Sequence, residues 1–293
     1  MKIHYKINED MSFQDFLIST RLPNKLIRSV ISHQLIELNH LPVDFIGSLS
    51  SKDNVSITIP DEEIDQTISH DNIPLDIRYE DDYLLVINKP SKMPVMVTKS
   101  HPHCTLSNAL CYYYELHQIN SKIHLVNRLD KDTSGLMIVA KNRYVKYLLS
   151  EDLKQKITRE YICVTEGKIK EKTGTIVLPI GKTDPMSIKR AVMNGGLEAI
   201  THYQVISEDD NFTVLNIRLE TGRTHQIRVH LSHLGHPIIG DSLYQSNYEG
   251  DLLLCSHKLQ FIHPITQKLM SFQIDLPESF HSYILKNEKG TDL

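Results

Sequence analysis

The sequence predicts an α+β fold with a large, mostly antiparallel sheet, preceded by a small N-terminal α/β unit. Strand-like runs separated by short turns recur through most of the chain, and only a few stretches have helical spacing. A strongly acidic segment divides the chain unevenly, and 293 residues suffice for one large and one small domain. We therefore expect a small domain at residues 1–60, an acidic linker at 61–75 and a large domain at 76–293.

The small unit is expected to contain two short helices followed by a strand pair. Apolar residues recur at helical spacing from Phe13 to Leu17 and from Leu26 to Ile31, and Pro23-Asn24 between these runs is a helix-start signal. Residues 35–39 and 55–59 then alternate between polar and apolar side chains in the manner of strands.

The elements of the large domain follow an acidic stretch. Residues 61–71 have too few apolar side chains to pack, which is typical of a linker. The large domain begins near Ile77, and residues 83–87 form a continuous apolar strand. Further strands are expected at 136–140, 161–164, 175–178, 200–206 and 212–219, and helices at 106–116 and 145–153.

Composition indicates an ordinary soluble globular protein that we expect to remain in the cytoplasm. The chain is 40% hydrophobic and 23% charged. No apolar stretch approaches the roughly 18 residues of a spanning helix, and the N-terminus lacks the apolar core of a signal peptide. The spacing of the four cysteines fits neither a disulfide framework nor a CxxC metal site, so we expect reduced, mostly buried thiols.

Charges of opposite sign are segregated along the chain, although the net charge is only -4. Residues 53–82 contain ten acidic residues and one basic residue, whereas residues 122–190 contain 15 basic and 8 acidic residues. The basic excess is expected for a partner that is a polyanion, and a solvated lysine-rich face is the alternative.

The most informative run begins at Arg128 and ends at Leu136. Within it Asp130 lies between cations, on a stretch rich in hydroxyl groups that ends in a glycine just before a buried strand. Proteins often place reactive groups at such positions, so Asp130 is the first candidate for chemistry.

A second run, from Thr221 to His230, supplies a partner for this carboxylate. The spacing of apolar residues after Thr224 predicts a short amphipathic helix with Thr224 as its N-cap and Gly235 as its stop. Arg223 and the helix start would then suit a phosphate, and Arg228 would suit a forked pair with a carboxylate. For either arginine alone, a surface salt bridge is the alternative.

Histidines at a three-residue spacing raise the question of a metal site. His230 and His233 could share a helix face, but Gly235 and Pro237 break the helix around His236. No HExxH or CxxC motif accompanies them, so no metal is expected.

Taken together, the motifs resemble those of the RluA-type pseudouridine synthases, which isomerise uridine in structured RNA. The resemblance runs from about Tyr79 to Asp275, and the blocks that carry it are Asn88-Lys89-Pro90, Arg128 to Lys141, Arg159-Glu160-Tyr161, Thr221 to His230 and Gly235 to Asp241. It implies the pseudouridine synthase fold, an RNA partner, and neither cofactor nor metal. One departure is Asn127, where the commonest form of the motif has histidine, and we expect altered packing there rather than loss of activity.

The resemblance also implies roles for individual residues. Asp130 matches the catalytic aspartate, which acts at C1′ of uridine by covalent addition or through an elimination pathway. Tyr161 matches the tyrosine that stacks on uracil and serves as base or proton relay, and Arg228 matches the arginine that pairs with the aspartate. Arg128 matches the arginine that helps the nucleotide leave the helical stack, a step that stacked uridine requires.

The small N-terminal unit resembles the S-four type RNA-binding domain. That resemblance implies that Lys25 and Arg28, on the second helix, face RNA phosphates. The turn residues Asn39-His40 and Lys52-Asp53 depart from the usual pattern, and residues 1–60 balance six basic against six acidic residues. RNA binding by this domain alone should therefore be weak.

These inferences predict an isomerase acting on RNA, as a monomer, with ribosomal RNA ahead of transfer RNA as the substrate. The first alternative is an inactive RNA-binding or ribosome-binding protein on the same scaffold, although the full set of motif residues speaks against it. The second is a glycoside hydrolase, which would need another acid near Asp130. Asp132 is close in sequence, but no acidic partner stands out in the other motif blocks.

Overall fold

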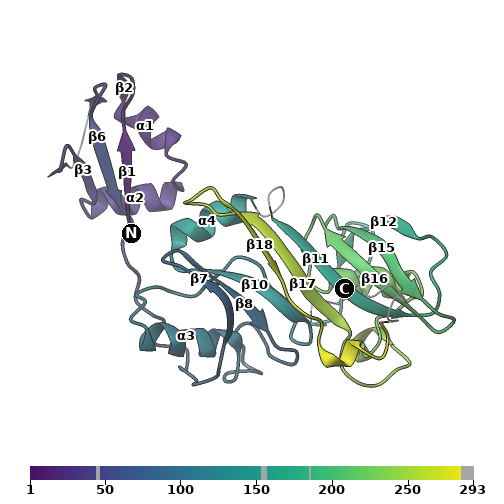
Figure 1. Ribbon diagram of the computed structural model, residues 1–293. Coiled ribbons are helices and arrows are strands. Elements are labelled where there is room, and N and C mark those ends of the chain that lie inside the picture. The colour runs from purple at the N-terminus through teal and green to yellow at the C-terminus, as the bar shows by residue number, and fades with distance from the viewer. Residues whose placement is uncertain (44–46, 153–156, 185, 285–293) are drawn as a thin grey trace.

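The larger part of the molecule is built on one long sheet (Figure 1). The structure, a computed structural model, describes residues 1–43, 47–152, 157–184 and 186–284. In those residues the sheet has ten strands in the order β12-β15-β16-β11-β17-β10-β8-β7, with β9 beside β10 and β18 beside β17. Their bounds are β7 Asp76–Glu80, β8 Leu84–Lys89, β9 His124–Leu125, β10 Ser134–Ala140, β11 Thr158–Glu166, β12 Thr173–Val177, β15 Ile200–Glu208, β16 Phe212–Leu219, β17 Leu254–Ile262 and β18 Leu269–Gln273. All neighbours in this sheet are antiparallel except β10 and β17. The predicted α+β class with a mostly antiparallel sheet is confirmed.

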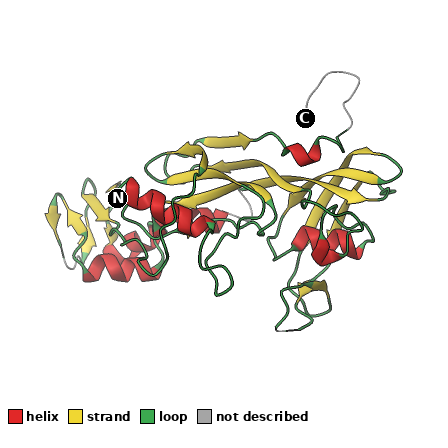
Figure 2. Cartoon of the chain, turned by 90° about the horizontal axis from the view of Figure 1, so that it is seen from below, coloured by secondary structure: helices red, strands yellow, loops and turns green. Residues whose placement is uncertain are grey.

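Helices and a small hairpin complete this part of the chain. Their bounds are α3 Leu106–Leu116, α4 Arg143–Asp152, α5 Gln226–His233, the short helical turns η1 Ser242–Tyr244 and η2 Glu278–Phe280, and the paired strands β13 Ile180–Gly181 and β14 Ala191–Val192. Figure 2 shows the sheet along its length, with the helical turn near the C-terminus on one side and longer helices on the other. Strand β10 is buried at all seven positions because other elements cover it on every side.

Most of the predicted elements are present, but six strands of this part were missed, namely β7, β9, β13, β14, β17 and β18. Helix α3 has the predicted bounds, and α4 begins two residues earlier than predicted. Strands β17 and β18 were not foreseen, although β17 lies in the middle of the sheet between β11 and β10. The sequence of β17 mixes polar and apolar residues without clean alternation, so its periodicity gave no signal.

The N-terminal unit contains more sheet than the predicted strand pair. Helices α1 Phe13–Ser19 and α2 Asn24–Ser32 confirm the predicted helices. The strands form a four-stranded sheet in the order β1-β6-β3-β4 and a separate pair, β2 with β5. The bounds are β1 Lys2–Lys6, β2 Met11–Ser12, β3 Ile36–Leu38, β4 Leu41–Pro42, β5 Ser48–Leu49 and β6 Asn54–Thr58. The expected strand pair is thus β3 and β6, and the overlooked β1 and β4 complete the sheet.

The acidic segment between the two units contacts the large domain through Glu62. The carboxylate of Glu62 accepts a hydrogen bond from Nε2 of His124 at 2.5 Å and pairs with Arg143 at 3.0 Å. On the other side, Tyr144 of α4 is buried in the hydrophobic core of the N-terminal unit. The two units therefore share contacts at α4, and in the segment between them Glu62 is paired with positively charged or donor groups of the large domain.

The cysteines and the helices each bear on an expectation from the sequence. All four cysteines are unpaired, with Cys104 exposed and the other three buried, as expected. Among the described helices none has both the length and the apolar character needed to cross a bilayer.

Gly135 allows β10 to approach β17, and Gly135→Ala is expected to lower the free energy of unfolding by more than about 3 kcal/mol. Its φ is 115°, and an added Cβ would lie 2.6 Å from the backbone nitrogen of Ser256 and even closer to its carbonyl oxygen. Urea unfolding followed by circular dichroism measures the change.

A matched control is Gly195→Ala, because Gly195 also has positive φ but open space around it. We expect that control to cost only about 1 kcal/mol. Equal effects at the two glycines would contradict the steric explanation.

Candidate active site

Asp130 lies on the wall of a cleft of about 830 Å³. The loop that carries it ends in a turn, in which the N–H of Thr133 donates to the carbonyl oxygen of Asp130 at 3.2 Å, and β10 begins at the next residue. The neighbouring Leu129 is buried, whereas the Asp130 side chain is 24% exposed. The carboxylate is therefore anchored by the core behind it and open to a ligand in front.

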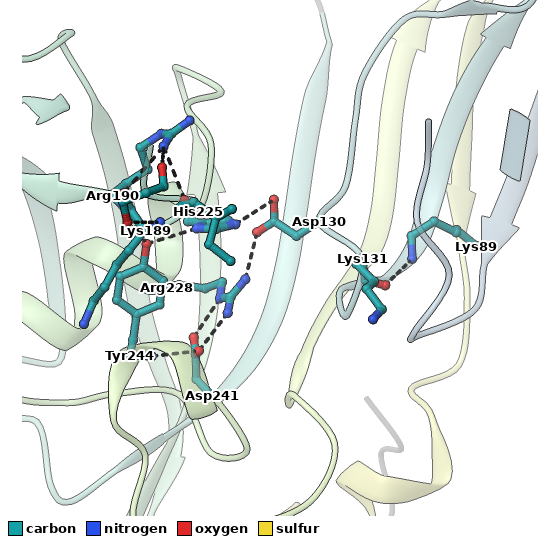
Figure 3. A network of polar contacts seen from close by, with 11 residues as sticks. Lys89, Asp130, Lys131, Lys189, Arg190, His225, Arg228, Asp241 and Tyr244 are labelled. Carbon is teal, nitrogen blue, oxygen red and sulfur yellow. Dashed lines mark hydrogen bonds and ion pairs between the residues drawn. The ribbon is translucent and has the colours of Figure 1, made fainter. Parts of the chain in front are cut away.

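Lys89 fixes this loop from behind (Figure 3). Its ammonium is fully buried and donates to the carbonyl oxygens of Pro90 at 2.7 Å, Met93 at 3.0 Å and Lys131 at 3.0 Å. Burial lowers the pKa of Lys89 to about 8. Because Lys131 follows Asp130 directly, the lysine limits the movement of the carboxylate.

Arg228 joins Asp130 to a second carboxylate. Its Nε and one terminal nitrogen donate to Asp241 at 2.7 and 2.8 Å, and the other terminal nitrogen lies 3.5 Å from Oδ2 of Asp130. The predicted pairing with Asp130 is therefore present, but the fork faces Asp241, which corrects the expected forked geometry. The reason is that Asp241 is almost completely buried and needs both donors, whereas Asp130 is partly solvated.

Asp241 is also the acidic neighbour that motif inspection did not find. Both of its oxygens accept hydrogen bonds from Arg228, and its side chain has no solvent exposure. A carboxylate held in this way cannot serve as the general acid of a glycoside hydrolase, which must carry a proton to its substrate.

The N-terminus of α5 differs from the prediction. The helix begins at Gln226, and the N-cap residue is His225, which has a left-handed backbone with φ of 57°. Thr224 is therefore not the N-cap, and the prediction that it caps this helix was wrong. Instead, Oε1 of Gln226 accepts from the backbone N–H of Arg223 at 2.9 Å and from the hydroxyl of Thr221 at 2.8 Å. The first side chain of the helix thus fixes the preceding loop, and no side chain caps the helix.

The unusual backbone of His225 turns its ring toward Asp130 (Figure 3). Nε2 lies 4.0 Å from Oδ1 of Asp130, and Nδ1 lies 3.0 Å from the hydroxyl of Tyr244. Tyr244 also accepts the backbone N–H of Arg190 at 3.0 Å and lies under the guanidinium of Arg228 at 5.2 Å. His225 and Tyr244 were not found in the sequence, because nothing in their spacing links them to Asp130.

Tyr161 lines the same cleft from β11 and is only 5% exposed. Burial raises the pKa of its phenol above the ordinary value of 10.0. A phenol that holds its proton this firmly is poorly suited to be a base at neutral pH and well suited to contact a flat ring.

The remaining predicted residues lie at the rim of the cleft or outside it. Arg128 is exposed on the rim and forms no hydrogen bond or ion pair with the described residues. Arg223 also lines the cleft, where its Nε donates to the carbonyl oxygen of Glu198 at 2.8 Å, and Thr224 lines it as well. Lys25 and Arg28 are exposed on α2 and do not line the cleft.

Asn127 has a packing role that explains how asparagine serves at this position. It is buried, and its Oδ1 accepts the N–H of Ile138 on β10 at 2.8 Å. At this position, which also lines the cleft, asparagine therefore supports β10.

The described residues contain no group of three or more histidines, cysteines or carboxylates arranged to hold a metal. His230 makes hydrogen bonds through Nδ1 to the hydroxyl of Thr201 at 3.0 Å and through Nε2 to the carbonyl oxygen of Leu178 at 2.9 Å. His236 contacts the carbonyl oxygen of Glu166 at 2.9 Å. Both histidines therefore use ring nitrogens to hold backbone carbonyl groups of neighbouring segments.

Acidification from about pH 7 to about pH 5 is expected to lower the free energy of unfolding. Burial lowers the pKa of four histidines below the ordinary value of 6.5, namely His124, His225, His230 and His257. In this range the unfolded chain binds protons at these positions that the folded chain does not, so stability falls as pH falls through about 6.5. Urea unfolding across this range measures the effect, and constant stability would contradict it.

Comparisons with known proteins agree with this site. A model of the family described as RNA pseudouridylate synthase matches residues 83–233. An uncharacterized RNA pseudouridine synthase of Bacillus subtilis, YjbO, is 39% identical over 252 residues, which is 85% of this chain and 88% of the relative. Ribosomal large subunit pseudouridine synthase D of Haemophilus influenzae is 41% identical over 227 residues, 72% of this chain and 70% of the relative.

Solved structures support the fold. The chain is similar to human RNA pseudouridylate synthase domain containing 4, with a TM-score of 0.57 and 24% identity over 70% of this chain and 89% of that one. It is also similar to human RNA pseudouridylate synthase domain containing 1, with a TM-score of 0.56 and 25% identity over 71% of this chain and 84% of that one.

Proposed function

Because the chain belongs to the RNA pseudouridylate synthase family and is an RNA pseudouridine synthase of the RluA type, we propose that Asp130 is the catalytic carboxylate of its uridine isomerisation. The observation that carries this proposal is the 3.5 Å contact between Asp130 and Arg228 on the wall of a cleft that is large enough for a nucleotide. A neighbouring guanidinium can orient the carboxylate toward a bound sugar.

In the proposed reaction Asp130 acts at C1′ of a uridine that has left the helical stack. The C1′–N1 bond breaks, the uracil turns, and a new bond forms between C1′ and C5, after which C5 loses its proton to water and N1 takes one up. Asp130 either adds covalently to C1′ or stabilises an elimination pathway. Tyr161 packs on the uracil ring, and Arg228 orients the carboxylate.

Arg128 is proposed to favour extrusion of the nucleotide. It is an exposed cation at the rim of the cleft, and Arg223 and Thr224 line the same cleft. Phosphate contacts at these positions would offset the few kcal/mol that unstacking costs. Lys25 and Arg28 are proposed to contact RNA phosphates from the N-terminal unit.

The proposed substrate is ribosomal RNA, with transfer RNA as the alternative. Relatives from Haemophilus influenzae and Pasteurella multocida, 41% and 39% identical, are named ribosomal large subunit pseudouridine synthase D. We further propose that the protein acts as a monomer, since Asp130, Tyr161 and Arg228 all line the cleft of a single chain. We also propose that it acts in the cytoplasm.

Tritium release tests the proposed substrate. Large-subunit ribosomal RNA and a pool of transfer RNAs are transcribed with tritium at uridine C5, and release of tritium to water is followed. We expect release from the ribosomal transcript, and none from the variant Asp130→Asn. Release from transfer RNA alone would refute the proposed target, and no release from either RNA would refute the proposed function.

A further inference from the structure

Arg159 is a buried cation without a partner inside the active-site cleft. It lies on β11 two residues before Tyr161, so the two side chains point to the same face of the strand. Arg159 is 5% exposed and lines the cleft together with Asp130 and Tyr161. With the described residues its side chain forms no hydrogen bond or ion pair, and its Nε is buried without any partner.

Burial of an unpaired guanidinium opposes folding, because the charge loses its hydration and gains nothing in return. Nearly all buried polar groups in proteins have partners, so a buried orphan that faces a cleft points to a ligand that supplies the missing acceptor. The loop above Arg159 confines it further, since a Cβ added at Gly222 would lie 3.2 Å from a terminal nitrogen of the guanidinium. The group is therefore held in place before any ligand arrives.

An RNA substrate offers two kinds of acceptor, the phosphate oxygens and the carbonyl oxygens of the base. A base that is flipped into a pocket goes deepest, whereas its phosphates stay near the mouth. The exposed cation Arg128 lies at the mouth of this cleft, and the buried Arg159 lies beside the equally buried Tyr161. The depth of Arg159 thus favours the base over the phosphate.

We propose that Arg159 binds a carbonyl oxygen of the uracil and stabilises the negative charge that uracil acquires during the reaction. This inference rests on the proposed function. When the C1′–N1 bond breaks, its electron pair passes to N1 and is delocalised onto O2 and O4. The electron deficiency left at C1′ is relieved by a bond to a carboxylate oxygen of Asp130, or by a C1′–C2′ double bond that forms when the C2′ proton is lost to a base. The pair forms the new bond from C5 to C1′ as the carboxylate of Asp130 leaves C1′ or, in the elimination pathway, as C2′ regains its proton. The C5 proton then passes to water and N1 takes up a proton from water, and Arg159 exchanges no proton.

The proposed contact strengthens as the reaction proceeds. A guanidinium binds a neutral carbonyl oxygen moderately and an anionic oxygen much more strongly. An interaction that is stronger in the transition state than in the bound substrate accelerates the chemical step. Arg159 should therefore affect the rate of bond cleavage more than the affinity for RNA.

The test compares wild type with Arg159→Met, which removes the charge at similar length, and Arg159→Lys, which keeps the charge without the fork. Tritium release from the ribosomal transcript is measured with enzyme in excess, so that a single turnover is observed at saturation. We expect Arg159→Met to slow release by about 100-fold or more, as for the loss of one preorganised donor. RNA affinity should change less than about threefold, and Arg159→Lys should restore part of the rate.

Two further readouts separate this role from the alternatives. Arg128→Gln is the matched control for a phosphate contact, and it should reduce by about one the slope of log affinity against log salt. Arg159→Met should leave that slope unchanged. Because the buried charge opposes folding, Arg159→Met should also unfold at the same temperature as wild type or a higher one.

Three results would overturn the inference about Arg159. They are a saturating rate of Arg159→Met within about threefold of wild type, a loss of affinity alone with a smaller salt slope, and a clearly lower unfolding temperature with a proportional loss of active enzyme. If wild type itself releases no tritium, the proposed function fails and this inference falls with it. Release by wild type together with any of the three results leaves the function standing and removes only the role of Arg159.

Discussion

Asp130→Asn is expected to reduce tritium release from RNA by about a thousandfold or more at saturating RNA. Asparagine keeps the shape of the side chain and one carbonyl oxygen, but it has no charge with which to bond to C1′ or to stabilise an elimination. The protein fold should be unaffected, because the side chain is 24% exposed and Arg228 retains its fork to Asp241. The measurement is single-turnover release with enzyme in excess.

The control for Asp130→Asn is that structure and RNA binding persist. The circular dichroism spectrum and the unfolding temperature should match those of wild type, and RNA affinity should be equal or higher since a negative charge has been removed from the cleft. Release within tenfold of wild type in a correctly folded variant would show that Asp130 is not the catalytic carboxylate. Asp132→Asn serves as the neighbouring comparison, and its effect should be small because Asp132 does not line the cleft.

The sequence was sufficient for the parts of the site that lie within one continuous motif. Asp130 was identified from its local setting alone, and the structure places it on the cleft wall with Arg228 beside it. Local signals also predicted α1, α2 and α3, because capping residues and apolar periodicity act over only a few residues.

Features that depend on contacts between distant segments were not predictable. Asp241 is 13 residues beyond Arg228 and takes its fork only because the chain turns back after α5. His225 faces Asp130 through a left-handed backbone, which only a few per cent of non-glycine residues adopt, and the neighbouring Thr224 had the better N-cap chemistry. Strand β17 was missed for a related reason, since its burial is set by β10 and β11 on either side rather than by its own pattern.

Asp241→Asn is expected to lower the free energy of unfolding by about 3–5 kcal/mol, because it leaves the buried charge of Arg228 without its main counter-ion. Arg228 and Asp241 are both nearly inaccessible to solvent, and Asp241 also accepts the backbone N–H of Tyr244 at 3.2 Å. Freed from Asp241, the guanidinium would turn its fork to Asp130 and hold the catalytic carboxylate away from the sugar. Tritium release should therefore fall as well, by about tenfold or more.

A double variant separates the two effects of Asp241→Asn. Arg228→Met with Asp241→Asn removes both charges, so stability should recover in part relative to Asp241→Asn, whereas activity should stay low because Asp130 has lost its guanidinium. Urea unfolding by circular dichroism and single-turnover tritium release measure the two quantities on the same samples. An Asp241→Asn variant as stable as wild type would mean that the fork contributes nothing to the fold. A double variant as active as wild type would mean that Asp130 needs no neighbouring cation, and the electrostatic account of this site would then be wrong.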